Sequence, residues 1–192
     1  MSRLEIVAVA VTVLSIWLTA RRNLWCWPLG LVACALYFKL FLDVRLYADM
    51  VLQALFGVAI LYGWIAWARG RRSDGAERPV DASIAVVPLP PQRAVVWLLA
   101  GALGAGVIGW GTSRYTDAAL PWLDATLSSF SLVAQLWTAR RHAANWLLWI
   151  AVDAVYVGMF VFKGLWLTAG LYALLCVLAV LGWRRWTAQR ER

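Results

Sequence analysis

The sequence predicts an all-α membrane protein with seven transmembrane helices, arranged as two three-helix repeats joined by one extra helix (3+1+3). Three observations lead to this fold class. First, 63% of the 192 residues are hydrophobic, whereas a soluble domain is about half apolar. Second, seven apolar segments reach or approach the roughly 20 residues that cross a bilayer. Third, the first three and the last three segments are related by an internal sequence repeat.

The seven segments define the expected spans, which are residues 4–20, 24–42, 46–68, 94–112, 122–139, 145–162 and 165–184. The first is short and the fifth is the least apolar. The first segment could be mistaken for a signal peptide, but it lacks a convincing cleavage site and its sequence recurs in the later repeat. We therefore expect it to be a helix of the mature protein.

Between the third and fourth spans, residues 69–93 are rich in charge and end in Pro88, Pro90 and Pro91. Such a segment is expected to be solvated and partly extended. The expected division of the chain is a first repeat at 1–68, a cytoplasmic linker at 69–93, an inversion-linker helix at 94–112 and a second repeat at 113–192.

The net charge of +8 reflects membrane topology rather than nucleic-acid binding, because the basic residues lie between apolar runs and not in a patch with aromatic residues. With seven spans, five basic residues fall on one side, namely Arg3, Lys39, Arg45, Arg114 and Lys163, and the other thirteen on the opposite side. Loops on the cytoplasmic side carry the excess of Lys and Arg. We expect a multi-pass protein of the inner (plasma) membrane, with its N-terminus outside and its C-terminus in the cytoplasm.

The internal repeat is carried by tryptophans and an arginine pair. Thr19–Arg22 recurs 119 residues later as Thr138–Arg141. The same offset pairs Trp27 with Trp146, Tyr37 with Tyr156, Phe41 with Phe160, Gly63-Trp64 with Gly182-Trp183, and Trp67 with Trp186. Each repeat covers three spans, so the fourth span would bring the chain back and give both triplets the same orientation. Transporters built from parallel repeats bind substrate at the repeat interface near the midplane.

The sixth span contains the strongest candidate site. On a helix, Trp146, Trp149, Asp153 and Tyr156 fall on one face, where they could hold a flat, cationic ring. An ionisable residue inside a span is by default functional and faces a cavity, although a polar contact between helices is the alternative. Asp153 lies about 12 Å into a core of roughly 30 Å. In the first repeat Gly30 and Cys34 replace Trp149 and Asp153, either to suit an asymmetric ligand or through plain divergence.

Polar residues in three other spans complete the predicted substrate-binding set. In the fifth span, Ser128, Ser131, Gln135 and Thr138 share one face and could either join helices or line a wet cavity. Gln135 offers both a donor and an acceptor to a ligand. Gln53 in the third span is similar, although it could equally be structural. Tyr37 is the first-repeat counterpart of Tyr156.

Several of these motifs resemble the nicotinamide riboside transporter (PnuC) family. The resemblance rests on Leu46–Asp49 with Leu52-Gln53, on Tyr62–Trp64 with Trp67, on Asn145–Trp149 with Asp153, and on Gly182-Trp183. It implies a fold similar to the sugar transporters of the SWEET type, a homotrimer, and uncoupled diffusion of an unphosphorylated vitamin that a cytoplasmic vitamin kinase then traps. It also implies that Trp146, Trp149 and Asp153 line the substrate site. Family members often have Asn where this chain has Asp153, and relatives for thiamine and riboflavin share the architecture.

Nicotinamide riboside is the expected substrate, with thiamine as the alternative. An indole face attracts a cation by roughly 0.5–2 kcal/mol, and nicotinamide riboside and thiamine both contain a cationic ring, whereas riboflavin is neutral. No cofactor or metal is expected, because Cys26, Cys34 and Cys176 have neither metal-ligand spacing nor a disulfide pattern.

Three other functions are alternatives to that of a vitamin facilitator. An intramembrane enzyme is disfavoured because the one histidine, His142, reads as a solvated loop residue beside Arg140 and Arg141 and Asp153 has no acidic partner. A non-transporting scaffold would need neither Asp153 nor the aromatic stripe. A proton-coupled carrier would use Asp153 as its protonation site.

Overall fold

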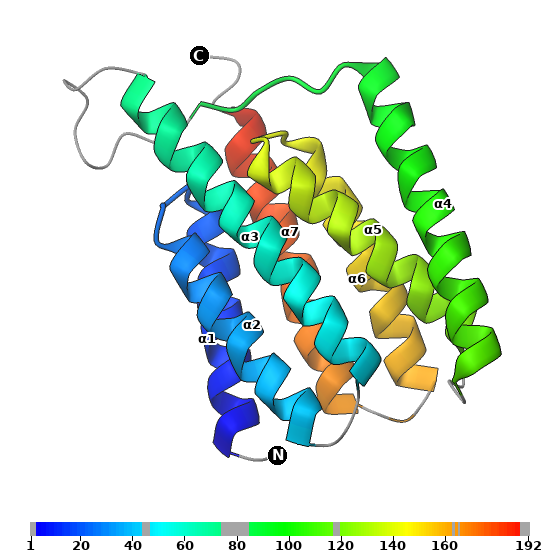
Figure 1. Ribbon diagram of the computed structural model, residues 1–192. Helices are drawn as coiled ribbons and strands as arrows, with labels where there is room; N and C mark the ends of the chain where they lie inside the picture. Colours follow the sequence, from blue (N-terminus) through cyan, green and yellow to red (C-terminus); the bar gives the residue numbers. More distant parts are fainter. Residues whose placement is uncertain are drawn as a thin grey trace.

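The computed structural model describes residues 3–43, 47–73, 85–116, 120–162, 164 and 166–188, which form seven α-helices (Figure 1). The helices are α1 (Arg3–Ala20), α2 (Cys26–Asp43), α3 (Tyr47–Ser73), α4 (Pro91–Tyr115), α5 (Pro121–Ala139), α6 (Ala144–Phe162) and α7 (Trp166–Ala188). Each predicted span coincides with one of them. Arg45, Leu46 and Lys163, which were named above, lie outside the described residues.

Six of the helices are long and apolar enough to cross a membrane, and α5 is the exception among the described residues. This agrees with the fifth span being the least apolar in the sequence. The reason is its position, because α5 packs against α3, α4 and α6 and buries nine of its side chains, including Leu127, Val133 and Trp137. A helix surrounded by protein needs less lipid-facing apolar surface than one at the edge of a bundle.

Proline and arginine explain where several helices begin and end. Proline is the first residue of both α4 and α5, a position where its missing N–H costs no hydrogen bond. Helix α3 continues to Ser73, beyond the predicted end of the third span at 68. The residues 69–73 contain no proline, and arginine is a good helix former, so the helix extends past the apolar segment.

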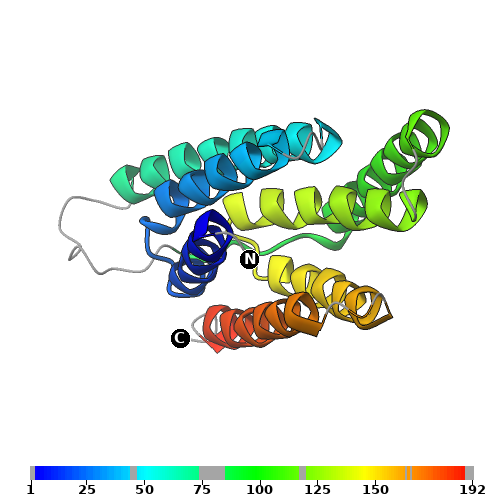
Figure 2. The same ribbon diagram turned by 90° about the horizontal axis from the view of Figure 1, so that it is seen from below.

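The helices of each triplet pack in chain order, α1 on α2 on α3 and α5 on α6 on α7. Two further contacts, α3 with α5 and α1 with α7, join the triplets into a closed ring. These two contacts are equivalent, since each pairs the third helix of one triplet with the first of the other. Helix α4 lies outside the ring and packs on α5 (Figures 1 and 2).

The α1–α2 and α5–α6 turns have the same backbone conformation. Arg22 and Arg141, which are equivalent in the repeat, have φ values of 55° and 66°, a left-handed conformation that non-glycine residues seldom adopt. The next residue closes each turn, with Asn23 N–H donating to Leu18 O and His142 N–H donating to Trp137 O, both at 3.0 Å. This is the Schellman pattern of helix termination. We call the end of the bundle that contains both turns the turn end.

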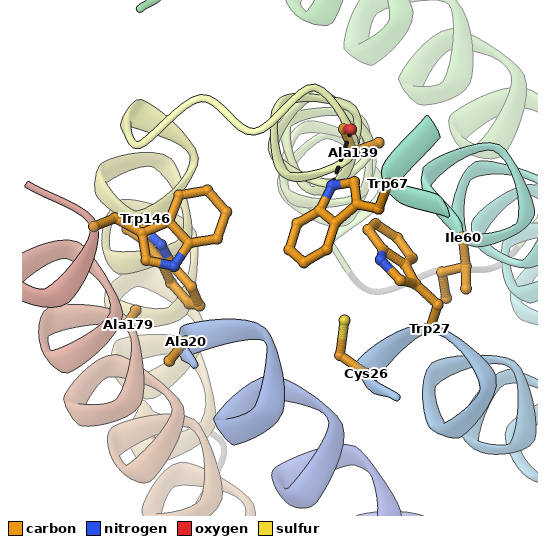
Figure 3. Packing of buried hydrophobic residues seen from close by; sticks show 9 residues of the cluster. Ala20, Cys26, Trp27, Ile60, Trp67, Ala139, Trp146 and Ala179 are labelled. Carbon is orange, nitrogen blue, oxygen red and sulfur yellow. Dashed lines mark hydrogen bonds between the residues drawn. The ribbon is translucent and has the colours of Figure 1, made fainter. Parts of the chain in front are cut away.

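Four buried tryptophans, Trp27, Trp67, Trp146 and Trp186, cross the interior at the turn end. Figure 3 labels three of them, Trp27, Trp67 and Trp146. Trp27 meets Trp67 edge to face, with centroids 5.1 Å apart, and Trp146 meets Trp186 in the same way at 5.6 Å. Trp67 and Trp186 then contact each other at 6.0 Å. We call these four residues the tryptophan chain. Because each triplet supplies an equivalent pair, the sequence repeat is also a repeat of packing.

Two equivalent glycines make room for this chain. A methyl group added at Gly63 would overlap the Trp27 ring, and one added at Gly182 would lie 2.5 Å from the Trp146 ring. Each indole therefore packs directly on the backbone of the third helix of its own triplet. The Gly-Trp pairs that marked the repeat in the sequence are thus needed for packing between helices.

Candidate functional site

A cavity of about 250 Å³ lies inside the ring of helices. Among the described helices, α4 alone supplies none of its lining residues. The walls are mainly apolar, with a small number of polar side chains from five of the six lining helices. That combination is typical of sites that bind a small organic molecule.

Six of the seven side chains predicted to bind substrate line this cavity. They come from four helices and are Tyr37, Gln53, Gln135, Trp146, Trp149 and Asp153. These residues are widely separated in the sequence, and the fold brings them to one place. Whether they bind a substrate stays a prediction.

Tyr156, the seventh predicted residue, is not among the lining residues. Its ring lies 4.6 Å from that of Tyr172 on α7 and 5.9 Å from that of Phe160. At a helical rotation of about 100° per residue, Tyr156 is turned roughly 60° away from Asp153. At this depth that side of α6 packs against α7, so the aromatic stripe of α6 meets the cavity only as far as Asp153.

Asp153 is the charged residue of the cavity wall. Its side chain is only 5% exposed, and it forms no hydrogen bond or ion pair with the part of the chain that the structure describes. A buried polar group without a partner requires an explanation. A carboxyl group that borders a cavity can obtain its partner from a bound molecule.

The opposite wall, formed by α2, differs in size and charge from the α6 wall. Gly30 and Cys34 line the cavity at the positions equivalent to Trp149 and Asp153. A Cβ atom at Gly30 would lie 3.4 Å from both Ile60 and Ser15, so only a small side chain fits there without displacing a neighbour. The cavity therefore has one aromatic, acidic wall and one small, uncharged wall, and it can hold an asymmetric molecule in a defined orientation.

Sequence reasoning missed the wall formed by α1. Thr12, Ser15, Ile16 and Thr19 all line the cavity. Their spacing of three or four residues is the pattern of a single helix face, and this signal was available in the sequence. It was overlooked because α1 contains no ionisable residue or amide in that stretch.

The tryptophan chain bounds the cavity at the turn end. Trp27 and Trp146 line the cavity, whereas Trp67 and Trp186 lie behind them and are both 0% exposed. A molecule that crosses the bundle through this cavity would have to pass these rings. In the structure the cavity is therefore closed toward the turn end.

His142 was expected to be a solvated loop residue, and that prediction is wrong. Its side chain is 7% exposed, and its Nδ1 lies 3.0 Å from the carbonyl oxygen of Val87. The N–H of Val87 in turn donates to Arg141 O at 3.0 Å. The segment before α4 therefore folds over the α5–α6 turn and covers the histidine. Burial lowers the pKa of His142, and the nearby Arg140, Arg93 and Arg141 lower it further, against the effect of the Val87 carbonyl.

Comparison with known proteins adds to this geometry. A family model described as nicotinamide mononucleotide transporter matches residues 2–188. The nicotinamide riboside transporter PnuC of Escherichia coli (strain K12) is 27% identical over 220 residues, a match that covers 100% of this chain and 88% of that protein. The riboflavin/roseoflavin transporter RibM of Streptomyces davaonensis is 26% identical over 173 residues, covering 90% of this chain and 78% of that protein.

A solved structure has the same fold. The crystal structure of the vitamin B3 transporter PnuC superposes with a TM-score of 0.78 at 22% identity and covers 98% of this chain and 82% of that one. The likeness confirms the all-helical membrane fold over nearly the whole chain.

Proposed function

Because this chain belongs to the nicotinamide mononucleotide transporter family and is similar to the nicotinamide riboside transporter PnuC, we propose that it carries nicotinamide riboside across the inner (plasma) membrane. The observation that supports this most is the convergence of six side chains from four helices on one cavity. A scaffold would not require such a cavity. An enzyme would require a reactive cluster, and His142 is instead held by Val87 and is not among the lining residues.

The chemistry of the α6 wall suits a cationic aromatic ring. Nicotinamide riboside contains a pyridinium, and the face of Trp149 would attract it by roughly 0.5–2 kcal/mol. Asp153 would provide a hydrogen-bond acceptor for a hydroxyl group of the ligand. Gln53 and Gln135 each provide a donor and an acceptor.

We infer that transport is uncoupled and that a cytoplasmic vitamin kinase traps the substrate. Asp153 is the one carboxyl group among the described lining residues, so no second carboxyl group in this wall could take up a proton from it. A proton-coupled carrier, with Asp153 as its protonation site, is the alternative. Uptake in the presence and absence of a pH gradient distinguishes the two.

For the architecture, we infer a 3+1+3 parallel repeat of the SWEET type, with α4 as the inversion linker. The equivalent α3–α5 and α1–α7 contacts and the position of α4 outside the ring support this arrangement. We further infer an outside N-terminus, which places the turn end at the cytoplasmic face, and assembly as a homotrimer. Reporter fusions at Gly75 and Arg192 should both read as cytoplasmic, and cross-linking in membranes should yield a trimer.

Riboflavin is a second candidate substrate, because one relative is a riboflavin/roseoflavin transporter. Riboflavin has a neutral three-ring system, which gains no cation–π attraction from Trp149. Thiamine is also cationic and remains the closest alternative by charge. The α6 wall therefore favours nicotinamide riboside or thiamine over riboflavin.

Titration of the purified protein with the three vitamins, monitored by tryptophan fluorescence, tests the proposal. We expect quenching by nicotinamide riboside at micromolar concentrations, and a much weaker response in a Trp149→Ala variant. Quenching by thiamine alone or by riboflavin alone would change the assigned substrate. No response to any of them would reject the vitamin-transporter function.

A further inference from the structure

The three hydroxyl side chains on the α1 wall share a property that bears on ligand selection. Each already donates its proton to a backbone carbonyl: Thr12 to Ala8 O at 2.8 Å, Ser15 to Cys26 O at 2.8 Å, and Thr19 to Ser15 O at 2.9 Å. A hydroxyl group has one proton and two acceptor lone pairs. With the proton in use, each oxygen can only accept a hydrogen bond from a molecule in the cavity.

These oxygens and the aromatic wall lie on either side of α7, which packs against both α1 and α6. Helices α1 and α6 do not contact each other in the described structure, and both line the cavity. At the turn end, α1 ends at Ala20 and α6 begins at Ala144. Ser15 lies five residues before Ala20, and Trp149 lies five residues after Ala144. At 1.5 Å per residue, both lie about 7.5 Å from that end. A molecule stacked on Trp149 would therefore lie at the same depth in the cavity as the α1 oxygens.

The second repeat does not reproduce this row of acceptors. Of the equivalent positions on α5, Thr138 lines the cavity and donates to Ala134 O at 2.9 Å. Ser131, the counterpart of Thr12, and Ala134, the counterpart of Ser15, are not among the lining residues. The hydroxyl row therefore belongs to the first triplet alone, whereas Trp149 and Asp153 belong to the second triplet.

We propose that Thr12, Ser15 and Thr19 are specificity-determining residues that accept hydrogen bonds from the hydroxyl groups of the ligand's sugar. The inference rests on the proposed function and extends it by assigning the sugar to α1 and the ring to α6. A ligand that offers hydroxyl donors satisfies these oxygens. A ligand that lacks donors leaves the lone pairs of the buried Ser15 and the part-buried Thr12 and Thr19 without a donor, which is unfavourable.

Binding measurements with matched variants and analogues test this assignment. The probes are nicotinamide riboside, its 2′-deoxy and 5′-deoxy analogues, and nicotinamide without a sugar. Thr12→Val, Ser15→Ala and Thr19→Val remove one acceptor each. We expect at least one of these variants to weaken nicotinamide riboside binding about tenfold. The same variant should bind one deoxy analogue as well as the wild type does, namely the analogue that lacks the hydroxyl group donating to the removed oxygen. Thr12→Ser and Thr19→Ser keep the acceptor and should retain wild-type affinity.

Thr112→Val is the control, because Thr112 makes the same kind of bond, to Ile108 O at 2.9 Å, on α4 away from the cavity. Its affinity for nicotinamide riboside should equal that of the wild type. Two results would overturn the assignment while leaving the proposed function intact. One is an equal loss of affinity for all sugar-containing probes and for nicotinamide, and the other is no loss of affinity in any of the three α1 variants. Failure of the wild-type protein to bind nicotinamide riboside would overturn both.

Discussion

Trp67 and Trp186 occupy equivalent positions in the two repeats, and their ring centroids lie 6.0 Å apart. Equivalent residues can contact each other only near the symmetry axis that relates the two triplets. At the turn end, that axis therefore passes between the rings of Trp67 and Trp186. The two indoles differ in one respect. The Trp67 N–H donates to the carbonyls of Thr138 and Ala139, at 3.2 and 3.1 Å, whereas the Trp186 N–H has no partner in the described residues.

This difference predicts unequal effects of the same substitution. Trp67→Phe removes a hydrogen bond between the triplets and should destabilise the protein by about 1 kcal/mol more than Trp186→Phe does. Both residues are 0% exposed, so the loss of packing is matched. Thermal unfolding in detergent measures the difference, and equal melting temperatures would contradict the role assigned to the Trp67 hydrogen bond.

Gly63 supports the Trp27 ring, and its substitution should be costly. Gly63→Ala forces the indole away from α3 and should destabilise the protein by about 1–3 kcal/mol, as overpacking of a core does. Gly57→Ala on the same helix is the control, since a methyl group there meets nothing within 4 Å, and it should be neutral or stabilising. Similar melting temperatures for the two variants would show that the Trp27–Gly63 contact is unimportant.

Because His142 is buried, we expect the stability of the folded protein to fall in acid. Its pKa is lowered from the ordinary 6.5, so the unfolded chain binds the proton more readily than the folded one. The stability that neutral His142 contributes is therefore fully present above pH 6.5 and is lost as the pH falls through the lowered value. Melting temperatures between pH 7.5 and pH 5 should fall more steeply for the wild type than for His142→Asn, which carries the residue found at the equivalent Asn23. Parallel curves would exclude His142 as the source.

Asp153 is predicted to act mainly through hydrogen bonding to the ligand. Asp153→Asn keeps the size of the side chain and its hydrogen-bonding capacity and should bind nicotinamide riboside within about threefold of the wild type. Asp153→Leu has a similar volume without polar atoms and should bind about tenfold more weakly. Fluorescence titration of both variants measures this, and equal loss in both would show that the negative charge is required.

The sequence was sufficient for the helices and for six of the side chains that line the cavity. The apolar segments of bilayer length predicted all seven helices to within a few residues. The exceptions are the C-terminal ends of α3 and α7, where the helix continues into charged residues beyond the apolar segment. The repeat, through Trp27, Trp146 and the two Gly-Trp pairs, indicated which residues would share an environment, and the structure packs them together.

What the sequence did not give depends on contacts between segments far apart in the chain. His142 is buried because residues near Val87 fold over its turn, and no periodicity shows that. Tyr156 fits the aromatic stripe by rotation, yet the neighbouring α7 covers its position. The acceptor role of Ser15 depends on its bond to Cys26 O across the α1–α2 turn, which only the three-dimensional structure shows.

Uptake of radiolabelled nicotinamide riboside by proteoliposomes tests the central claim that this cavity carries the substrate across the membrane. The wild-type protein should bring the internal concentration to the external one, with or without a pH gradient. Trp149→Ala should weaken binding by about 1–3 kcal/mol on the scale of base–aromatic stacking. The folded variant should show slow uptake at low substrate concentration, with cooperative thermal unfolding as the check that it is folded. Uptake by the wild type no faster than by empty liposomes, or uptake by Trp149→Ala equal to that of the wild type, would contradict the claim.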